Sequence, residues 1–136
     1  MKKALITITM ALVIAIIAVI LVVSYEASSE SLETVQIKME NAGYRTRVSS
    51  EFEIEDSSDE GLLGRVSCWK KGESEGFLDV SSFDSVRNAM KYYFHVKAGY
   101  AEYIACYGTT AIVPKLKRIG KLVIECDDKG FADFKR

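Results

Sequence analysis

The sequence predicts an α+β protein. An N-terminal transmembrane helix precedes a two-layer domain, in which an antiparallel sheet of about five or six strands carries two helices on one face. Three observations lead to this fold class. An uncharged apolar run covers residues 4–23. Apolar residues recur at helical spacing within 31–42 and 83–98. Short segments of alternating polarity, separated by Gly-containing and acidic turns, occupy most of the remainder.

The apolar run from Ala4 to Val23 contains no charge, Pro or Gly. A helix of about 20 residues spans about 30 Å, the thickness of the hydrocarbon core of a bilayer. A cleavable signal peptide is the alternative, and its apolar region is usually shorter, with a small-x-small cleavage site. The best candidate for the residue before a cleavage site is Ala27, but the bulky Tyr25 lies two positions before it, where such a site has a small residue. We therefore expect an uncleaved anchor over residues 1–23, with a secreted domain as the alternative.

Flanking charge predicts the orientation of this anchor. Lys2 and Lys3 precede the run, whereas residues 24–43 contain four Glu and one basic residue, Lys38. We expect a single-pass protein in the cell membrane, with a cytoplasmic N-terminus. Membrane lipid would surround residues 4–23, residues 24–30 would form a tether, and residues 31–136 would form one extracytoplasmic domain.

The charge balance argues against a nucleic-acid partner. All 19 acidic residues and 16 of the 18 basic residues follow the apolar run, which leaves a formal charge of −3 on that part of the chain. A nucleic-acid-binding domain usually carries a basic surface instead. About 100 residues remain for the domain, which is enough for a single hydrophobic core.

Two further helices follow from apolar periodicity. In residues 31–42 the apolar positions fall on one helical face, and Gly43 supplies a left-handed C-cap. In residues 83–98 a second stripe forms, Ser81–Asp84 reads as a capping box, and Gly99 is expected to end the helix. The stripes consist of Leu32, Val35, Met39 and Ala42, and of Val86, Ala89, Met90, Tyr93 and Phe94.

Alternation and turn signals predict the strands. In the first strand Val48, Phe52 and Ile54 are expected to point toward the core. A turn is expected at residues 127–130, followed by a return strand at 131–134. The predicted strands are 46–55, 62–70, 77–80, 100–107, 111–113 and 122–126.

The three cysteines, Cys68, Cys106 and Cys126, all lie in strand-like contexts. We interpret them as buried free thiols that serve as small apolar side chains. A disulfide between Cys68 and Cys106 is the alternative. No CxxC spacing is present, so no metal site is expected.

No catalytic or cofactor-binding residue is predicted. His95, the single histidine, falls opposite the apolar stripe of its helix and is expected to face solvent. Residues 51–60 hold six carboxylates, whose spacing matches no EF-hand, so we interpret them as a solvated edge and loop. No cofactor is implied.

Two features form a candidate interaction surface. A basic cluster could bind an acidic protein partner or a phosphate of the outer leaflet. Tyr103 lies in a Tyr-rich segment whose aromatic rings could recognise a carbohydrate or a protein. The cluster consists of Lys115, Lys117, Arg118 and Lys121, in what reads as a connection between strands.

Short motifs in residues 31–114 resemble small membrane-anchored or lipoprotein-type prokaryotic domains of unknown function. These are Met39–Tyr44, Phe83–Ala89, the Tyr92-Tyr93 pair and Tyr107-Gly108. The lipid-attachment cysteine of lipoproteins is missing. The resemblance implies an extracytoplasmic setting and no particular chemistry.

These observations predict a membrane-anchored binding or interaction domain rather than an enzyme. Two alternatives make structural demands that can be checked. A small-ligand sensor needs a pocket between a helix and the sheet. A carboxylate-based enzyme needs a pocket that holds at least two carboxylates of raised pKa.

Overall fold

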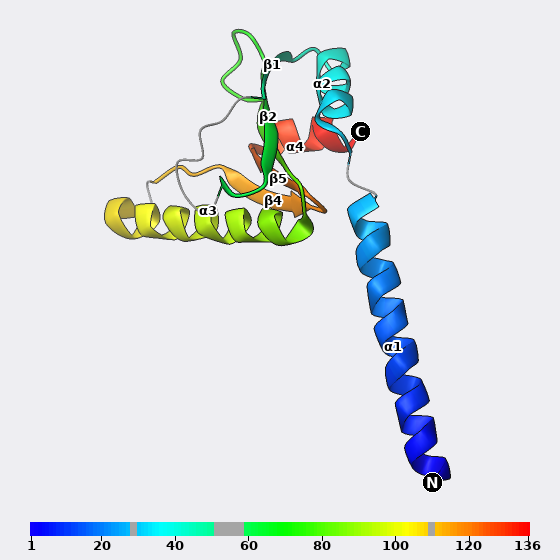
Figure 1. Ribbon diagram of the computed structural model, residues 1–136. Coiled ribbons are helices and arrows are strands. Elements are labelled where there is room, and N and C mark those ends of the chain that lie inside the picture. Colours follow the sequence, from blue (N-terminus) through cyan, green and yellow to red (C-terminus); the bar gives the residue numbers. More distant parts are fainter. Residues whose placement is uncertain (28–29, 51–58, 109–110) are drawn as a thin grey trace.

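The computed structural model describes residues 1–27, 30–50, 59–108 and 111–136, with the side chains of the first helix described over residues 6–20. The described chain has four helices and five strands (Figure 1). Their order is α1 (Lys2–Ala27), α2 (Leu32–Asn41), β1 (Arg45–Ser49), β2 (Leu62–Trp69), β3 (Phe77–Phe83), α3 (Val86–Tyr107), β4 (Lys115–Ile119), β5 (Leu122–Cys126) and α4 (Asp128–Lys135).

The five strands form one antiparallel sheet in the order β1-β2-β3-β5-β4. Consecutive strands pair directly through β1, β2 and β3, and β4 pairs with β5 as a hairpin. β5 inserts between β3 and β4, so that β3 and β5 occupy the middle of the sheet with β2. The predicted α+β class and antiparallel sheet are confirmed.

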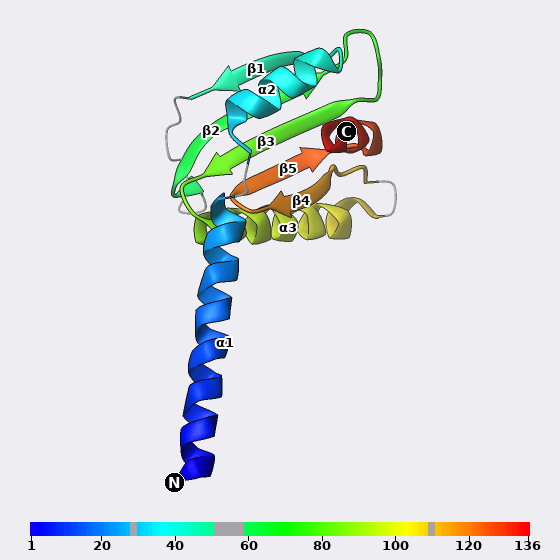
Figure 2. The ribbon, with the colours of Figure 1, turned by 90° about the vertical axis from the view of Figure 1, so that its right-hand side faces the viewer.

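The prediction of two helices on one face is wrong. α2 and α4 cover one face of the sheet, and α3 covers the opposite face, which gives three layers (Figures 1 and 2). The reason lies in the central strand β3, which carries buried apolar side chains on both faces: Leu78 and Val80 point to the α2 side, and Phe83 points to the α3 side. Each face therefore needs a cover.

The larger core lies between the sheet and the α2–α4 layer. Val35 and Met39 of α2 are fully buried against Val66 of β2 and Ile124 of β5. α4 closes the layer through Phe134. Burying a side chain of this size contributes about 1.5–3 kcal/mol, so this cluster supplies most of the domain's apolar stabilisation.

A smaller core lies beneath α3, where Phe83, Ala89, Tyr92 and Val123 pack together. The rings of Phe83 and Tyr92 lie 5.1 Å apart. A register shift between Leu62 and Gly64 in β2 brings Leu62 to this cluster. Such bulges change the side of the sheet to which the following residues point.

Helices form over the first two ranges for which the sequence predicts them, and α1 extends beyond residues 4–23 at both ends. Ser31 caps α2 by accepting a hydrogen bond from the Thr34 N–H, and Gly43 follows the helix with φ +85°. α1 is a continuous helix whose described side chains are exposed. No helix among the described residues is long and apolar enough to cross a membrane.

Three strands appear where the sequence predicts them. β5 has the predicted bounds, β2 ends one residue early, and β3 continues three residues further to Phe83. β1 covers the start of predicted strand 46–55 and ends at Ser49, and residues 51–55, with Phe52 and Ile54, fall outside the described residues. Val48 is 46% exposed, contrary to expectation, because β1 is the edge strand.

The strand predicted at residues 100–107 is wrong, because α3 continues through Gly99 to Tyr107. Gly99 is absent from the positive-φ glycines, so it adopts an ordinary helical conformation rather than a cap. The predicted capping box is also wrong: residues 81–83 belong to β3, and Ser85 caps the helix by accepting from the Asn88 N–H. Tyr100, Tyr103 and Tyr107 are spaced by three and four residues, as helical neighbours are.

The C-terminal predictions also need correction. No strand forms at 111–113, and the basic connection is itself a strand, β4. The predicted turn and return strand at 127–134 are replaced by α4. Asp127 starts this helix as its N-cap, because its side chain accepts hydrogen bonds from Gly130, Gly76 and Phe77 N–H groups. The sequence predicted a turn at Asp127 because Asp is common both in turns and at helix N-caps.

Candidate functional site

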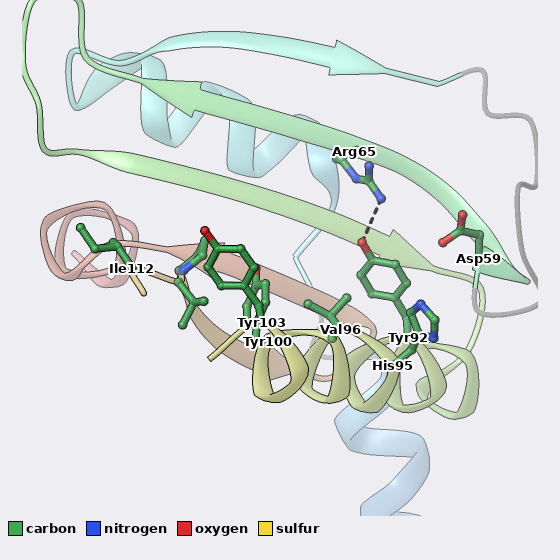
Figure 3. A pocket seen from close by; sticks show the side chains of 11 residues that line it. Asp59, Arg65, Tyr92, His95, Val96, Tyr100, Tyr103 and Ile112 are labelled. Carbon is green, nitrogen blue, oxygen red and sulfur yellow. Dashed lines mark hydrogen bonds between the residues drawn. The ribbon is translucent and has the colours of Figure 1, made fainter. Parts of the chain in front are cut away.

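A pocket of about 640 Å³ lies between α3 and the sheet (Figure 3). Six of its residues come from α3, one comes from β2, and the others come from the segments next to β2 and β4. The lining consists of Asp59, Arg65, Tyr92, His95, Val96, Gly99, Tyr100, Tyr103, Ile112, Val113 and Pro114.

Helical spacing explains how α3 forms one wall. Tyr92, Val96, Tyr100 and Tyr103 follow one another at intervals of four or three residues, so they share one side of the helix. Gly99 lies between them and has no side chain to occupy the space. A Cβ atom added there would meet nothing within 4 Å. The missing side chain therefore widens the pocket at the middle of α3.

One end of the pocket is polar. Arg65 of β2 donates from Nε to Ser81 Oγ at 2.9 Å and from Nη2 to the Tyr92 hydroxyl at 3.1 Å (Figure 3). These bonds fix the plane of the guanidinium beside the Tyr92 ring, 5.9 Å from its centroid. Burial raises the pKa of Tyr92, so its hydroxyl stays protonated at neutral pH. Asp59 and His95 complete this end of the lining.

The other end is apolar and aromatic. Ile112, Val113 and Pro114 line it from the segment before β4, opposite Tyr103 of α3. Ile112 is 93% exposed, so its whole side chain is available to a bound molecule. The Tyr103 ring lies 4.6 Å from that of Tyr107, which extends the aromatic surface along the helix.

Carboxylates lie on the sheet face beneath α3. Tyr100 donates its hydroxyl hydrogen bond to Glu125 of β5, and burial together with this bond raises the Tyr100 pKa far above its ordinary value. Asp79 of β3 pairs directly across from Glu125. Its Oδ1 atom is buried and has no hydrogen-bond partner among the described residues. The two acidic side chains therefore lie side by side on this face of the sheet.

The predicted basic cluster does not share one face. Strand alternation sends Lys115 and Lys117 to the α4 side of β4 and Arg118 to the other side. Lys115 forms an ion pair with Asp128, and Lys117 lies 5.7 Å from the Phe131 ring centroid. Arg118 donates to the Gly120 carbonyl oxygen. Lys121 lies in the turn before β5, where its carbonyl accepts from the Phe83 N–H.

Tyr103 lies on α3 in the pocket lining, on a different element from those four cations. It is 46% exposed, as a surface contact residue needs to be. His95 is exposed, as predicted, but it also lines the polar end of the pocket. The acidic residues 51–58 fall outside the described residues; of the remainder, Glu60 forms an ion pair with Lys91 at 3.0 Å.

All three cysteines are free. Cys68 and Cys126 are buried in the α2–α4 core, whereas Cys106 is exposed on α3. The alternative Cys68–Cys106 disulfide is wrong because these residues lie on opposite sides of the sheet. No group of three or more His, Cys, Asp or Glu that could hold a metal ion occurs among the described residues.

The sequence did not single out the residues that define the polar end, Arg65 and Tyr92. Arg65 is a lone cation in a strand, which ordinarily indicates a solvated face. One signal was available: Arg65, Ser67 and Asp79 place polar residues on the inner strands β2 and β3, where an apolar pattern is usual.

Comparison with protein-family models, with curated proteins and with solved structures finds no match to this chain. The resemblance to membrane-anchored or lipoprotein-type prokaryotic domains therefore stays a prediction.

Proposed function

We propose that this protein is a membrane-tethered domain that binds a small organic molecule in the pocket beneath α3. The observation that carries the proposal is the division of one pocket into a polar end at Arg65 and an apolar end at Ile112. Ligand sites are typically concave, largely apolar and supplied with a few fixed polar groups. The pocket between a helix and the sheet is also the feature that the sensor hypothesis requires.

The polar end favours an anionic group on the ligand. A guanidinium presents a planar set of donors that matches carboxylate and phosphate oxygens. The bonds to Ser81 and Tyr92 hold the Arg65 group in one orientation, which reduces the entropy lost when a ligand binds. The Tyr92 hydroxyl, His95 and the carboxylate of Asp59 lie at the same end.

The apolar end favours a hydrophobic body of modest size. Val96, Tyr103 and Ile112 offer aliphatic and aromatic surface, and the volume of about 640 Å³ falls within the range of small-molecule sites. Burying apolar area contributes about 25 cal/mol per Å². The ligand class that fits both ends is a small amphiphile with one anionic group.

The carboxylate-enzyme alternative receives less support. Among the described residues the lining contains one carboxylate, Asp59, and not the two that such an enzyme needs. Binding is therefore the function that the geometry supports best.

We assign the tethering to residues 4–23. Two observations support this assignment. The uncharged apolar run is longer than the stretch 6–20 whose side chains the structure describes, and the whole run lies within the continuous helix α1. Described apolar side chains of α1, among them Ile6, Met10 and Ile14, are more than half exposed, and lipid would cover them.

A reporter fusion tests this arrangement. Alkaline phosphatase joined after Arg136 should be active in a bacterial host, because the charges of Lys2 and Lys3 keep the N-terminus in the cytoplasm. A cytoplasmic reporter such as β-galactosidase at the same position should be inactive. A stable but inactive phosphatase fusion, with an active galactosidase fusion, would contradict the orientation.

Ligand binding is tested with three probes that differ only in the head group: 3-phenylpropionate, 3-phenylpropanol and 3-phenylpropylamine. Titrations of the full chain in lipid nanodiscs, followed by NMR, should show the tightest binding for the acid. The variant Arg65→Gln should weaken acid binding by about tenfold, the loss expected for a charged hydrogen bond. The alcohol should lose little.

Arg47→Gln is the matched control, because Arg47 is an exposed arginine on the neighbouring strand β1. It should leave all three affinities unchanged. Preference for the amine, or equal losses in the two arginine variants, would refute the anionic assignment. No saturable binding of any probe would refute the pocket as a site for molecules of this class.

A further inference from the structure

The outer face of α3 carries exposed apolar side chains. Met90, Phe94 and Ile104 are 40%, 56% and 42% exposed, and Ala101 lies between them along the helix. The steps of four, seven and three residues place all four within one arc of the helix. This arc is distinct from the inner side of α3, where Tyr92 and Val96 face the pocket and the smaller core.

Basic residues lie beside and within this arc. Arg87 and Lys91 lie beside it near the start of α3, where Lys91 forms an ion pair with Glu60, and Lys97 lies within it near the middle of the helix. The helix has a single acidic residue, Glu102. The Lys97 ammonium is 6.0 Å from the Tyr93 ring centroid, so its aliphatic stem lies along the helix surface. An apolar stripe accompanied by Lys and Arg is typical of helices that lie in the interface of an anionic membrane.

The arrangement of the helices brings this face toward the proposed bilayer. α3 forms the side of the domain toward which α1 projects, and its axis runs across that of α1 (Figures 1 and 2). The chain between α1 and α2 is short, from Ala27 to Leu32. At no more than about 3.6 Å per residue, it keeps the domain within about 20 Å of the end of α1.

We propose that α3 lies on the membrane surface, with Met90, Phe94 and Ile104 inserted at the level of the lipid head groups. This inference rests on the proposed tethering by residues 4–23. Arg87 and Lys97 would lie among anionic phosphates. The lipid surface would thereby set the orientation of the domain.

A tryptophan probe tests the contact. The full chain with Phe94→Trp and Trp69→Phe is reconstituted into vesicles of phosphatidylcholine and phosphatidylglycerol that carry brominated acyl chains. Bromine quenches a fluorophore that reaches the acyl boundary. The fluorescence of the new tryptophan should fall at least about twofold relative to unbrominated vesicles, as expected for a residue buried in the interface.

Two control proteins test whether the quenching is specific to position 94. Trp69 of the unsubstituted chain ends β2 beside the β2–β3 turn, at the end of the domain away from α1, and should be quenched little (Figures 1 and 2). Glu102→Trp with Trp69→Phe places the probe on α3 about 80° around the helix from Phe94. It should be quenched less than the probe at position 94.

Flotation of the same vesicles separates the two ways of failing. Chain that does not float with lipid would refute the tethering on which the inference rests. Chain that floats, with equal and weak quenching at positions 94, 102 and 69, would refute the α3 contact and leave the tethering intact. Circular dichroism of each variant verifies the fold, and Met90→Trp replaces Phe94→Trp if that variant misfolds.

Discussion

Asp127 connects two parts of the domain through one carboxylate. Its Oδ2 atom accepts hydrogen bonds from the Gly76 and Phe77 N–H groups at 2.6 and 3.1 Å, and its Oδ1 atom accepts one from Gly130 N–H at 2.7 Å. The carboxylate thereby joins the start of β3 to the N-terminus of α4. The role of a helix cap was hidden in the sequence, because Asp127-Asp128 followed by Lys129-Gly130 also fits a turn.

Replacement of Asp127 by Ala should lower the free energy of unfolding by about 2–4 kcal/mol, since it removes a cap and leaves buried donors unpaired. Urea unfolding followed by Trp69 fluorescence measures the loss. Asp128→Ala is the control: Asp128 is exposed and pairs with Lys115 across the surface, so the loss should stay below about 1 kcal/mol. Equal losses would contradict the assigned role.

The same carboxylate predicts a pH dependence. Burial opposes the charge of Asp127, but the three backbone N–H groups outweigh it and lower the pKa below its ordinary value. A lowered folded-state pKa stabilises the protein above the unfolded pKa of about 3.9, and this contribution disappears as the pH falls through the folded value. The stability difference between the wild type and Asp127→Ala should therefore narrow below about pH 4. A constant difference down to pH 2 would contradict this account.

The cysteines predict a simple pattern of reactivity. Burial raises the pKa of Cys68 to about 12 and that of Cys126 to about 11, whereas Cys106 is exposed. The thiolate is the reactive form, so at pH 8 a thiol reagent should modify one cysteine quickly in the native protein and three after unfolding. Cys106→Ser should remove the fast reaction. A native protein that shows no fast thiol would indicate that Cys106 is not exposed as described.

At the scale of elements, periodicity located the helices and central strands but not their ends. Val35 and Met39 marked α2 correctly, because their side of the helix is also the side that the sheet covers. The sequence predicted that this helix ends at Gly99, although the tyrosines after Gly99 continue the helical spacing of Tyr92 and Val96. The sequence did not predict β4, because Lys115, Lys117 and Arg118 interrupt the alternation of polar and apolar residues that indicates a strand. β4 is an edge strand, so its charged side chains can reach solvent.

Gly99 distinguishes a continuous α3 from a helix that ends there. In a continuous helix, Gly99→Ala should raise the free energy of unfolding by about 0.5–1 kcal/mol, because Ala has the higher helix propensity and the added Cβ meets no atom within 4 Å. Thermal unfolding measures the change. Gly108→Ala is the contrast: with φ +72° it should destabilise the protein. Destabilisation by Gly99→Ala would instead indicate a cap at that position.

At the scale of the whole molecule, the pocket arises from how the layers are arranged. Among the described helices, α3 is the one that covers this face of the five-stranded sheet, and it packs mainly over β3, β5 and β4. Arg65 lies on the face of β2 beside α3, and Ile112, in the segment before β4, lines the apolar end of the pocket. This site could not be read from the sequence, because it depends on strand order and on the side to which α3 packs.

The proposed functions of α1 and α3 complement each other in this arrangement. Residues 4–23 would hold the chain at the bilayer, the outer face of α3 would rest on lipid, and its inner face would line the ligand site. The sequence predicted the membrane anchor at residues 4–23 from composition alone. The use of both faces of α3 follows only from the fold.

The measurement that tests the central claim most directly is the position of a bound probe. In the full chain with labelled methyl groups, 3-phenylpropionate should give intermolecular nuclear Overhauser effects from its ring to Ile112, Val113 and Val96. It should give none to Val35 and Ile124, which are buried in the opposite core. Contacts at the pocket methyl groups that weaken in Arg65→Gln are the predicted result. Saturable binding with contacts elsewhere on the domain would contradict the assignment of the pocket.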